Sequence, residues 1–210
     1  MIVYPITRVT LFPLCRLLIR SVRGLENIPK RGPFILACHH LGPLDALFIA
    51  AVVVPRINQK IHFIASIAPW GPLWKEIVAK RWSGCIPFDK NNRQTCLDTA
   101  RQYLSEGRVV GIFPVGLLDE RESNSSKGKS GTARLALWSK VPVVPVGLIS
   151  HESVTLGAII IKHLTRPRII RISIGEPMTF SDVYDKPITY ELLRNVTSRI
   201  MQSIDLINKY

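Results

Sequence analysis

The stretch FILACHHLGPLDALFIAAVVV, residues 34–54, holds a strand, a turn and a helix in immediate succession. Residues 34–38 are short and apolar, which is typical of a buried strand. Residues 44–54 are apolar over a length too great for a strand, and Pro55 is expected to close this helix. The Gly42–Pro43 pair between the two segments is suited to a turn. The stretch therefore predicts the strand–loop–helix unit of an α/β fold.

The same alternation continues along the rest of the chain. Further strands are expected at residues 60–66, 85–88, 109–113 and 141–148, with two β segments around a turn within 158–175. Further helices are expected at residues 70–80, 93–107, 131–140 and 189–206. Strands alternating with helices over 210 residues predict one α/β domain, in which a single mixed sheet is layered by helices.

The composition is apolar and basic at the same time. Hydrophobic residues make up 47% of the chain and the formal net charge is +13. The hydrophobic content excludes a disordered chain, and the charge favours an anionic partner: a lipid surface, a nucleic acid or a phosphorylated substrate. Nucleic acid is the weakest of these, because neither a zinc-finger spacing nor a compact basic recognition helix is visible. We therefore expect no nucleic-acid partner.

Four cysteines stand at positions 15, 38, 85 and 96, each in an apolar context and none in a C-x-x-C pair. This spacing favours reduced core thiols over disulfides or zinc ligands. Reduced thiols in turn favour a cytosolic redox environment.

Residues 1–23 form the most apolar terminal segment, although charges interrupt every stretch of the ~20 apolar residues that a membrane span needs. The segment also lacks the small-residue cleavage site of a signal peptide. From Leu14 onward the pattern predicts an amphipathic helix, with arginines 16, 20 and 23 on one side and Leu14, Leu17, Leu18 and Val22 on the other. Such a helix lies in a bilayer interface among anionic headgroups, or it packs on the core with solvated arginines. We expect the first: residues 1–23 attach the protein to an anionic membrane surface at its cytoplasmic face, and residues 24–210 form the domain.

His39, His40 and Asp45 are ionisable residues in an otherwise apolar neighbourhood. A histidine acts as a base near pH 7 most effectively when a carboxylate fixes its tautomer and stabilises its cation. A turn between residues 40 and 45 would bring Asp45 to His40. The alternatives are a helix-capping aspartate with packed histidines and, less favoured, a metal site, for which no third ligand cluster has suitable spacing.

The motif order resembles the glycerolipid acyltransferase family, which includes the 1-acylglycerol-3-phosphate (lysophosphatidic acid) acyltransferases. An approach segment and four blocks carry the resemblance over about residues 24–177: GLENIPKRGPFILA (24–37), then HHLGPLD (39–45) for N-H-x4-D, GCIPFDK (84–90) for G-x-I-x-x-D-R, FPVGLL (113–118) for F-P-E-G-T-R followed by KSGTARLAL (129–137), and VPVVPV (141–146), with IGEP (174–177) after them. His39 stands where the family usually has asparagine, and Lys90 stands where it has arginine.

The resemblance implies a function and a mechanism. An acyltransferase domain of the glycerol-phosphate acyltransferase type, residues 24–210, would move an acyl chain from acyl-CoA or acyl carrier protein to the hydroxyl of lysophosphatidic acid, giving phosphatidic acid. His40 would be the base and Asp45 its orienting carboxylate, with no metal, cofactor or covalent acyl-enzyme.

The second and third blocks are implied to hold the acceptor's glycerol phosphate. That role falls to Asp89 and Lys90 in the second block and to Gly116 in the third. Arg121 and Lys129 in the following loop are further candidates for phosphate contacts; the alternative for both is a solvated loop charge.

The third block departs most from the family pattern. Val115 stands in place of the usual glutamate, and Leu117 and Leu118 stand in place of threonine and arginine. Three further functions therefore stay open: an acyltransferase that acts on another lipid hydroxyl, a catalytically weak lipid-binding relative, and a thioester hydrolase in which the same base activates water.

Overall fold

A computed structural model describes residues 2–42, 44–66, 76–77, 81–89, 91–115, 128–150 and 170–209 of the chain. Within these residues, seven strands form one sheet in the order β1-β7-β6-β2-β5-β3-β4. Their bounds are β1 Ile19–Arg23, β2 Phe34–Cys38, β3 Ile61–Ala65, β4 Ile86–Pro87, β5 Val109–Ile112, β6 Val143–Ser150 and β7 Ile170–Ile174.

Five neighbouring strands, β6, β2, β5, β3 and β4, are parallel to one another. Strand β7 is antiparallel to β6, and β1 is parallel to β7, so these two strands run in the opposite direction. All five residues of β2 are buried, as a central parallel strand covered on both faces requires. The five carboxyl ends lie along one edge of the sheet, the usual place for a site in such folds.

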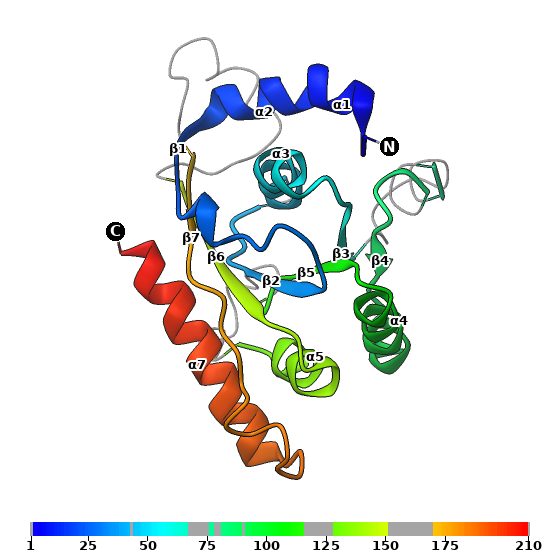
Figure 1. Ribbon diagram of the computed structural model, residues 1–210, viewed down its shortest axis with the longest axis vertical. Helices are drawn as coiled ribbons and strands as arrows, with labels where there is room; N and C mark the ends of the chain where they lie inside the picture. The colour runs from blue at the N-terminus through cyan, green and yellow to red at the C-terminus, as the bar shows by residue number, and fades with distance from the viewer. Residues whose placement is uncertain are drawn as a thin grey trace.

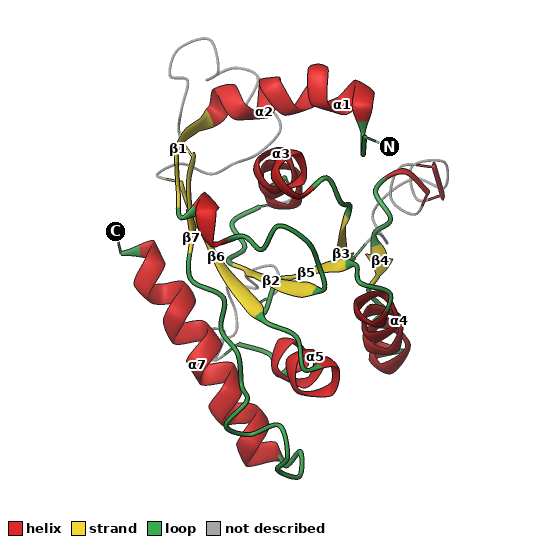
Figure 2. Cartoon of the chain, in the orientation of Figure 1, coloured by secondary structure: helices red, strands yellow, loops and turns green. Residues whose placement is uncertain are grey.

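Helices cover both faces of the sheet (Figures 1 and 2). The helices are α1 Pro5–Val9, α2 Leu11–Leu18, α3 Asp45–Ile57, α4 Arg93–Ser105, α5 Gly131–Ser139 and α7 Tyr190–Asn208, with a short 3-10 turn at Leu25–Asn27. On one face α3 packs on the sheet and α2 packs on α3, and these elements share one apolar cluster. On the other face α4, α5 and α7 share a second cluster with the opposite sides of the strands. The expectation of one mixed sheet between helical layers is confirmed.

The helix that follows β2 does not end at Pro55, as the sequence suggested, but continues to Ile57. A proline inside a helix leaves the carbonyl four residues earlier without its usual donor. That carbonyl belongs to Ala51, and Arg16 of α2 donates to it from Nε at 3.2 Å. A neighbouring helix thus replaces the hydrogen bond that the proline removes.

The N-terminal segment is also divided differently from the expectation. The helix ends at Leu18, and residues 19–23 form β1, which pairs with β7. Leu18 lies in the core with Phe12 and Cys15, whereas Leu14 and Leu17 are exposed. The expected division into one arginine side and one leucine side is therefore wrong, because α3 covers part of the leucine side.

The other expected elements agree closely with the structure wherever it describes them. Strands β2 to β6 and helices α4, α5 and α7 begin and end within about two residues of their expected limits. Most of the expected helix at 70–80 and the first β segment of 158–175 lie outside the described residues. Among the described residues, no helix has the length and hydropathy to cross a membrane.

Candidate active site

The site is built where β2 and β5 end and α3 begins. Side chains alternate along β2, so that Phe34, Leu36 and Cys38 face the α3 layer. His40 is the next position of that alternation, just beyond the end of the strand. Asp45 is the first residue of α3, the helix that covers the same face. The tight loop between them brings the two side chains together.

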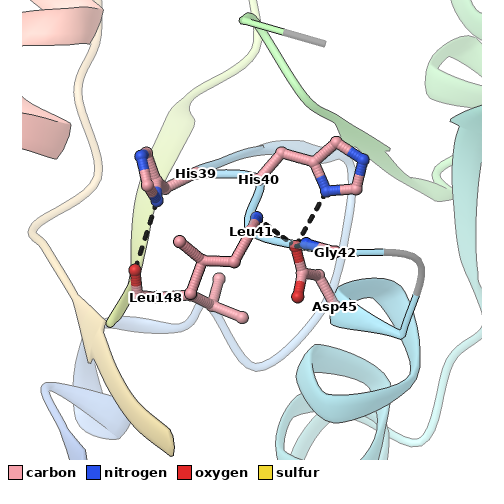
Figure 3. A network of polar contacts seen from close by, with 6 residues as sticks. All are labelled: His39, His40, Leu41, Gly42, Asp45 and Leu148. Atoms are coloured by element: carbon pink, nitrogen blue, oxygen red, sulfur yellow. Dashed lines mark hydrogen bonds and ion pairs between the residues drawn. The ribbon is translucent and has the colours of Figure 1, made fainter. Parts of the chain in front are cut away.

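The Asp45 carboxylate is the centre of this loop (Figure 3). Its Oδ2 accepts three hydrogen bonds, from His40 Nδ1 at 2.8 Å and from the backbone N–H groups of Leu41 at 2.5 Å and Gly42 at 2.8 Å. The side chain is only 2% exposed. A buried carboxylate that accepts three hydrogen bonds is fixed in position. The loop therefore has one well-defined conformation around it.

The hydrogen bond to Asp45 sets what His40 can do. A carboxylate is an acceptor only, so the proton of this bond belongs to His40 Nδ1. In the neutral ring, Nε2 then carries the free lone pair. This nitrogen points away from Asp45 in Figure 3, and it has no hydrogen-bond partner within the described residues. The His40 side chain is 13% exposed, so the lone pair lies at the margin of the core rather than deep inside it.

An aromatic ring covers one face of His40. Phe113 directly follows β5, and its ring is stacked on the imidazole, with centroids 4.4 Å apart and 29° between the planes. Phe63 of β3 stacks on Phe113 in turn, at 5.7 Å and 17°. The base candidate therefore has a carboxylate at one edge and an apolar wall against its face.

His39 is directed to a different neighbour from His40. Its backbone N–H donates to Val146 of β6 at 2.8 Å, and its ring Nδ1 lies 3.2 Å from the carbonyl oxygen of Leu148. A carbonyl accepts only, so Nδ1 carries the proton here as well. His39 thus ties the end of β2 to β6, and the two adjacent histidines have separate partners.

Cys38 precedes the two histidines but is not a nucleophile in this setting. Burial raises the pKa of its thiol well above the usual range, and the negative charge of Asp45 raises that pKa further. A thiol that stays protonated neither attacks a thioester nor binds a metal. All four cysteines are free. No three His, Cys, Asp or Glu side chains among the described residues are grouped as metal ligands would be.

The acceptor-binding candidates are only partly described. Lys90, Gly116 and Arg121 lie outside the described residues. Asp89 is exposed and accepts from the backbone N–H of Asn91 at 2.8 Å, so it stabilises its own turn beyond β4. Lys129 is exposed, and its backbone N–H donates to the carbonyl of Pro114 at 2.8 Å, beside Val115. The geometry thus brings Lys129 to the third block, and the roles of all five residues stay predictions.

Two features of the site were not foreseen from the sequence. The backbone N–H groups of Leu41 and Gly42 hold Asp45, and Phe113 stacks on His40. The first could not be found from residue types, because every residue except proline carries such a donor. The second had a signal in strand alternation, which places Phe113 and His40 beyond the ends of neighbouring strands on the same face.

A carboxylate-bound histidine at the carboxyl edge of five parallel strands is the arrangement of an α/β enzyme that uses a general base. Comparison with known proteins narrows this class. The model of the family named Acyltransferase matches residues 19–149. The chain belongs to the acyltransferase family.

Individual relatives agree with this assignment. The chain is 29% identical over 198 residues to the 1-acyl-sn-glycerol-3-phosphate acyltransferase of Bacillus subtilis, covering 90% of this chain and 88% of that protein. It is 24% identical over 205 residues to a chicken protein named DGAT1/2-independent enzyme synthesizing storage lipids, covering 88% of this chain but only 58% of the relative. The crystal structure of the 1-acyl-sn-glycerophosphate (LPA) acyltransferase of Thermotoga maritima has a TM-score of 0.59 over 97% of this chain and 82% of that chain, at 18% identity. The last similarity concerns the fold.

Proposed function

We propose that the protein transfers an acyl group from an acyl thioester to the free hydroxyl of lysophosphatidic acid, giving phosphatidic acid. The observation that carries this proposal is the 2.8 Å contact between His40 Nδ1 and Asp45 Oδ2, which leaves Nε2 open at the sheet edge of a member of the acyltransferase family. The acyl donor is acyl-CoA or acyl carrier protein.

In the proposed reaction, Nε2 of His40 takes the proton of the acceptor hydroxyl as its oxygen attacks the thioester carbonyl carbon. The new C–O bond forms, the C–S bond breaks, and the departing sulfur recovers the proton from Nε2. Asp45 balances the positive charge that His40 carries between these two transfers. Phe113 limits the access of water to one face of His40, which favours transfer over hydrolysis.

The first test is transfer to lysophosphatidic acid by the wild type and by His40→Ala, with lipid products measured by mass spectrometry. Loss of a positioned general base lowers the rate by ~10² to 10⁴. A His40→Ala variant within a few-fold of the wild-type kcat contradicts the mechanism. Thioester loss that does not need an acceptor would instead identify a hydrolase.

A second candidate is transfer to another lipid hydroxyl, and Val115 is the observation that favours it. Val115 stands where the family has a glutamate, and its half-buried side chain packs on the cluster of α4 and α5. An apolar group offers no hydrogen bond to a glycerol phosphate. A panel of lysophosphatidic acid, monoacylglycerol and lysophosphatidylcholine separates the two candidates. If Val115→Glu raises kcat/KM for lysophosphatidic acid and for no other acceptor, the missing carboxylate limits use of that substrate. A wild type without turnover on any acceptor would be a lipid-binding relative.

We further propose that the N-terminal segment, residues 1–23, attaches the protein to the anionic cytoplasmic face of a membrane. Helix α2 packs on α3 through Phe12, Cys15 and Leu18, and α1 packs on α2. Their outer side is apolar: Ile2, Ile6, Val9, Leu11, Leu14 and Leu17 are 36 to 76% exposed. An outward apolar helix face on a protein with a net charge of +13 fits an anionic bilayer interface.

Vesicle co-sedimentation tests this attachment. Ile6→Gln with Val9→Gln should weaken binding to anionic vesicles by about 10²-fold, because burial of two such side chains is worth about 3 kcal/mol. Ile188→Gln with Tyr190→Gln is the matched control, since these residues are also exposed but lie at the start of α7. Equal binding of both double variants would move the membrane surface elsewhere.

A further inference from the structure

The His40 imidazole is the end member of a stack of three rings. His40, Phe113 and Phe63 come from the ends or interior of β2, β5 and β3, which are neighbours in the sheet. The ring planes turn only 29° from His40 to Phe113 and 17° from Phe113 to Phe63. The stack therefore runs across three strands on the face that α3 covers.

Gly111 makes room for the inner end of this stack. It pairs with Phe63 across the β3–β5 ladder, and a Cβ atom on Gly111 would overlap the Phe63 ring. The ring thus lies against the backbone of β5, in the space that a side chain would fill. From there it reaches Phe113, which follows Gly111 by two residues, just beyond the end of β5, and lies on the same face. The missing side chain of Gly111 is what allows Phe63 to support Phe113.

The hydrogen bond to Asp45 alone does not fix the His40 ring. A single contact at Nδ1 holds one atom of the imidazole, whereas the ring can still tilt about that contact and sweep Nε2 away from the acceptor hydroxyl. A flat ring at 4.4 Å from the imidazole centroid removes this tilt. The electron-rich face of a phenyl ring also attracts a cation, so the contact strengthens when His40 takes up a proton.

We propose that Phe113 is a positioning residue for His40, and that Phe63 acts on His40 through Phe113. The two phenyl rings hold the imidazole plane so that Nε2 faces the acceptor hydroxyl, and they stabilise the imidazolium of the reaction. This inference rests on the proposed base role of His40. Phe113 is the first residue of the third motif block, so one residue of this block would act on the base rather than on the acceptor.

The first experiment compares Phe113→Leu, which keeps apolar bulk but removes the ring, with Phe113→Tyr, which keeps the ring. Phe113→Leu should lower kcat by about two- to ten-fold, the worth of one aromatic contact, with KM for both substrates within two-fold of wild type. Phe113→Tyr should keep a kcat close to that of the wild type, because the ring is retained. Phe180→Leu is the matched control: Phe180 is fully buried in the cluster on the opposite face of the sheet, so its loss should lower stability and leave kcat unchanged.

A double-mutant cycle tests the action of Phe63 through Phe113. Phe63→Leu should lower kcat less than Phe113→Leu does, and the double variant should be no slower than Phe113→Leu alone, because the second ring has no effect without the first. If the two losses multiply instead, Phe63 acts independently and that part of the proposal is wrong.

The stack also has a spectroscopic signature that needs no active variant. Phe113 lies over His40, so its ring current should shift the carbon-bound ring protons of His40 upfield in NMR spectra of histidine-labelled protein. Assignment follows from the signals that His40→Ala removes. Phe113→Leu should return them toward ordinary values, and Phe180→Leu should not. Unshifted signals in the wild type would overturn the proposal even if Phe113→Leu fails to fold.

The kinetic outcomes separate this inference from the function on which it rests. If His40→Ala is inactive while Phe113→Leu keeps the wild-type kcat, His40 is the base and only the positioning role fails. If His40→Ala itself remains active, the proposed function fails first. A fall in kcat that Phe180→Leu reproduces at equal folded fraction would reduce Phe113 to general packing.

Discussion

Asp45→Asn is the most informative single change, because the structure separates its effect on rate from its effect on stability. The asparagine oxygen can still accept from the backbone N–H groups of Leu41 and Gly42. The hydrogen bond from His40 Nδ1 can also be kept. Each of the three bonds changes from a charged to a neutral acceptor, at a cost of about 1 kcal/mol, so the free energy of unfolding should fall by at most about 3 kcal/mol. Removal of a buried charge, on a side chain that is only 2% exposed, offsets part of this loss. The variant should therefore remain folded.

The effect of Asp45→Asn on the reaction should be a clear loss of rate. An amide oxygen in the place of Oδ2 can still accept from His40 Nδ1 and keep its tautomer, but the neutral amide cannot balance the imidazolium of His40. The corresponding change in a Ser-His-Asp triad, which also reverses the tautomer, lowers kcat by ~10⁴; because only the counter-charge is lost here, we expect about 10². The assay is release of free thiol from acyl-CoA with lysophosphatidic acid as acceptor, together with thermal unfolding.

Two further variants sharpen the comparison. Asp182→Asn breaks an exposed ion pair to Arg199 at 2.9 Å and should change stability by less than about 1 kcal/mol, with no effect on rate. Asp45→Ala leaves two amide donors unpaired and should lower stability by about 2 to 6 kcal/mol. A kcat of Asp45→Asn within ten-fold of wild type would refute the role of Asp45 as the partner of the base.

Two other predictions concern stability. Arg16→Ala removes the donor to the buried carbonyl of Ala51, so it should lower the free energy of unfolding by about 1 to 3 kcal/mol in chemical denaturation, whereas Arg20→Ala, at an exposed position, should change it by less than about 0.5 kcal/mol. The pKa of His62 is lowered from 6.5 mainly by burial, so the unfolded chain binds a proton there that the folded protein does not. Stability should therefore be complete above about pH 6.5 and decline as the pH falls below it. A His62→Gln variant should show a shallower decline, and an unchanged slope would show that other groups govern it.

Much of the fold is legible in the sequence because its central strands are short apolar runs. The β2 strand FILAC is buried on both faces, and the helix after it could be predicted from the length of its apolar run. The ends of elements were harder to predict where a distant segment supplies what the local sequence lacks. Local sequence predicts that the helix ends at Pro55, but it continues because Arg16 supplies the replacement donor. Local sequence also predicts a helix over Ile19–Arg23, but this segment is a strand because it pairs with β7, about 150 residues away.

The candidate site also has a part that the local sequence predicts and a part that distant segments decide. His40 and Asp45 could be predicted as a pair, because histidine and aspartate are rare in an apolar stretch and their spacing allows contact. The partners that make the pair rigid are backbone donors and a phenylalanine, which are common everywhere in proteins. These partners reach the pair because side chains alternate along each strand and because β2 and β5 are neighbours in the sheet. The order of strands in a sheet cannot be deduced from any single segment of the sequence.

The pairing of β1 with β7 has a consequence for synthesis on the ribosome. Ile19 lies opposite Ile170, so β1 waits for a partner strand that is made about 150 residues later. At 5 to 20 residues per second, the interval is roughly 8 to 30 s. Throughout that time the edge strand stays unpaired, and the apolar helices before it are already outside the ribosome. A nascent chain in this state exposes apolar helix surface well before the sheet is complete, which is the condition under which chaperones bind.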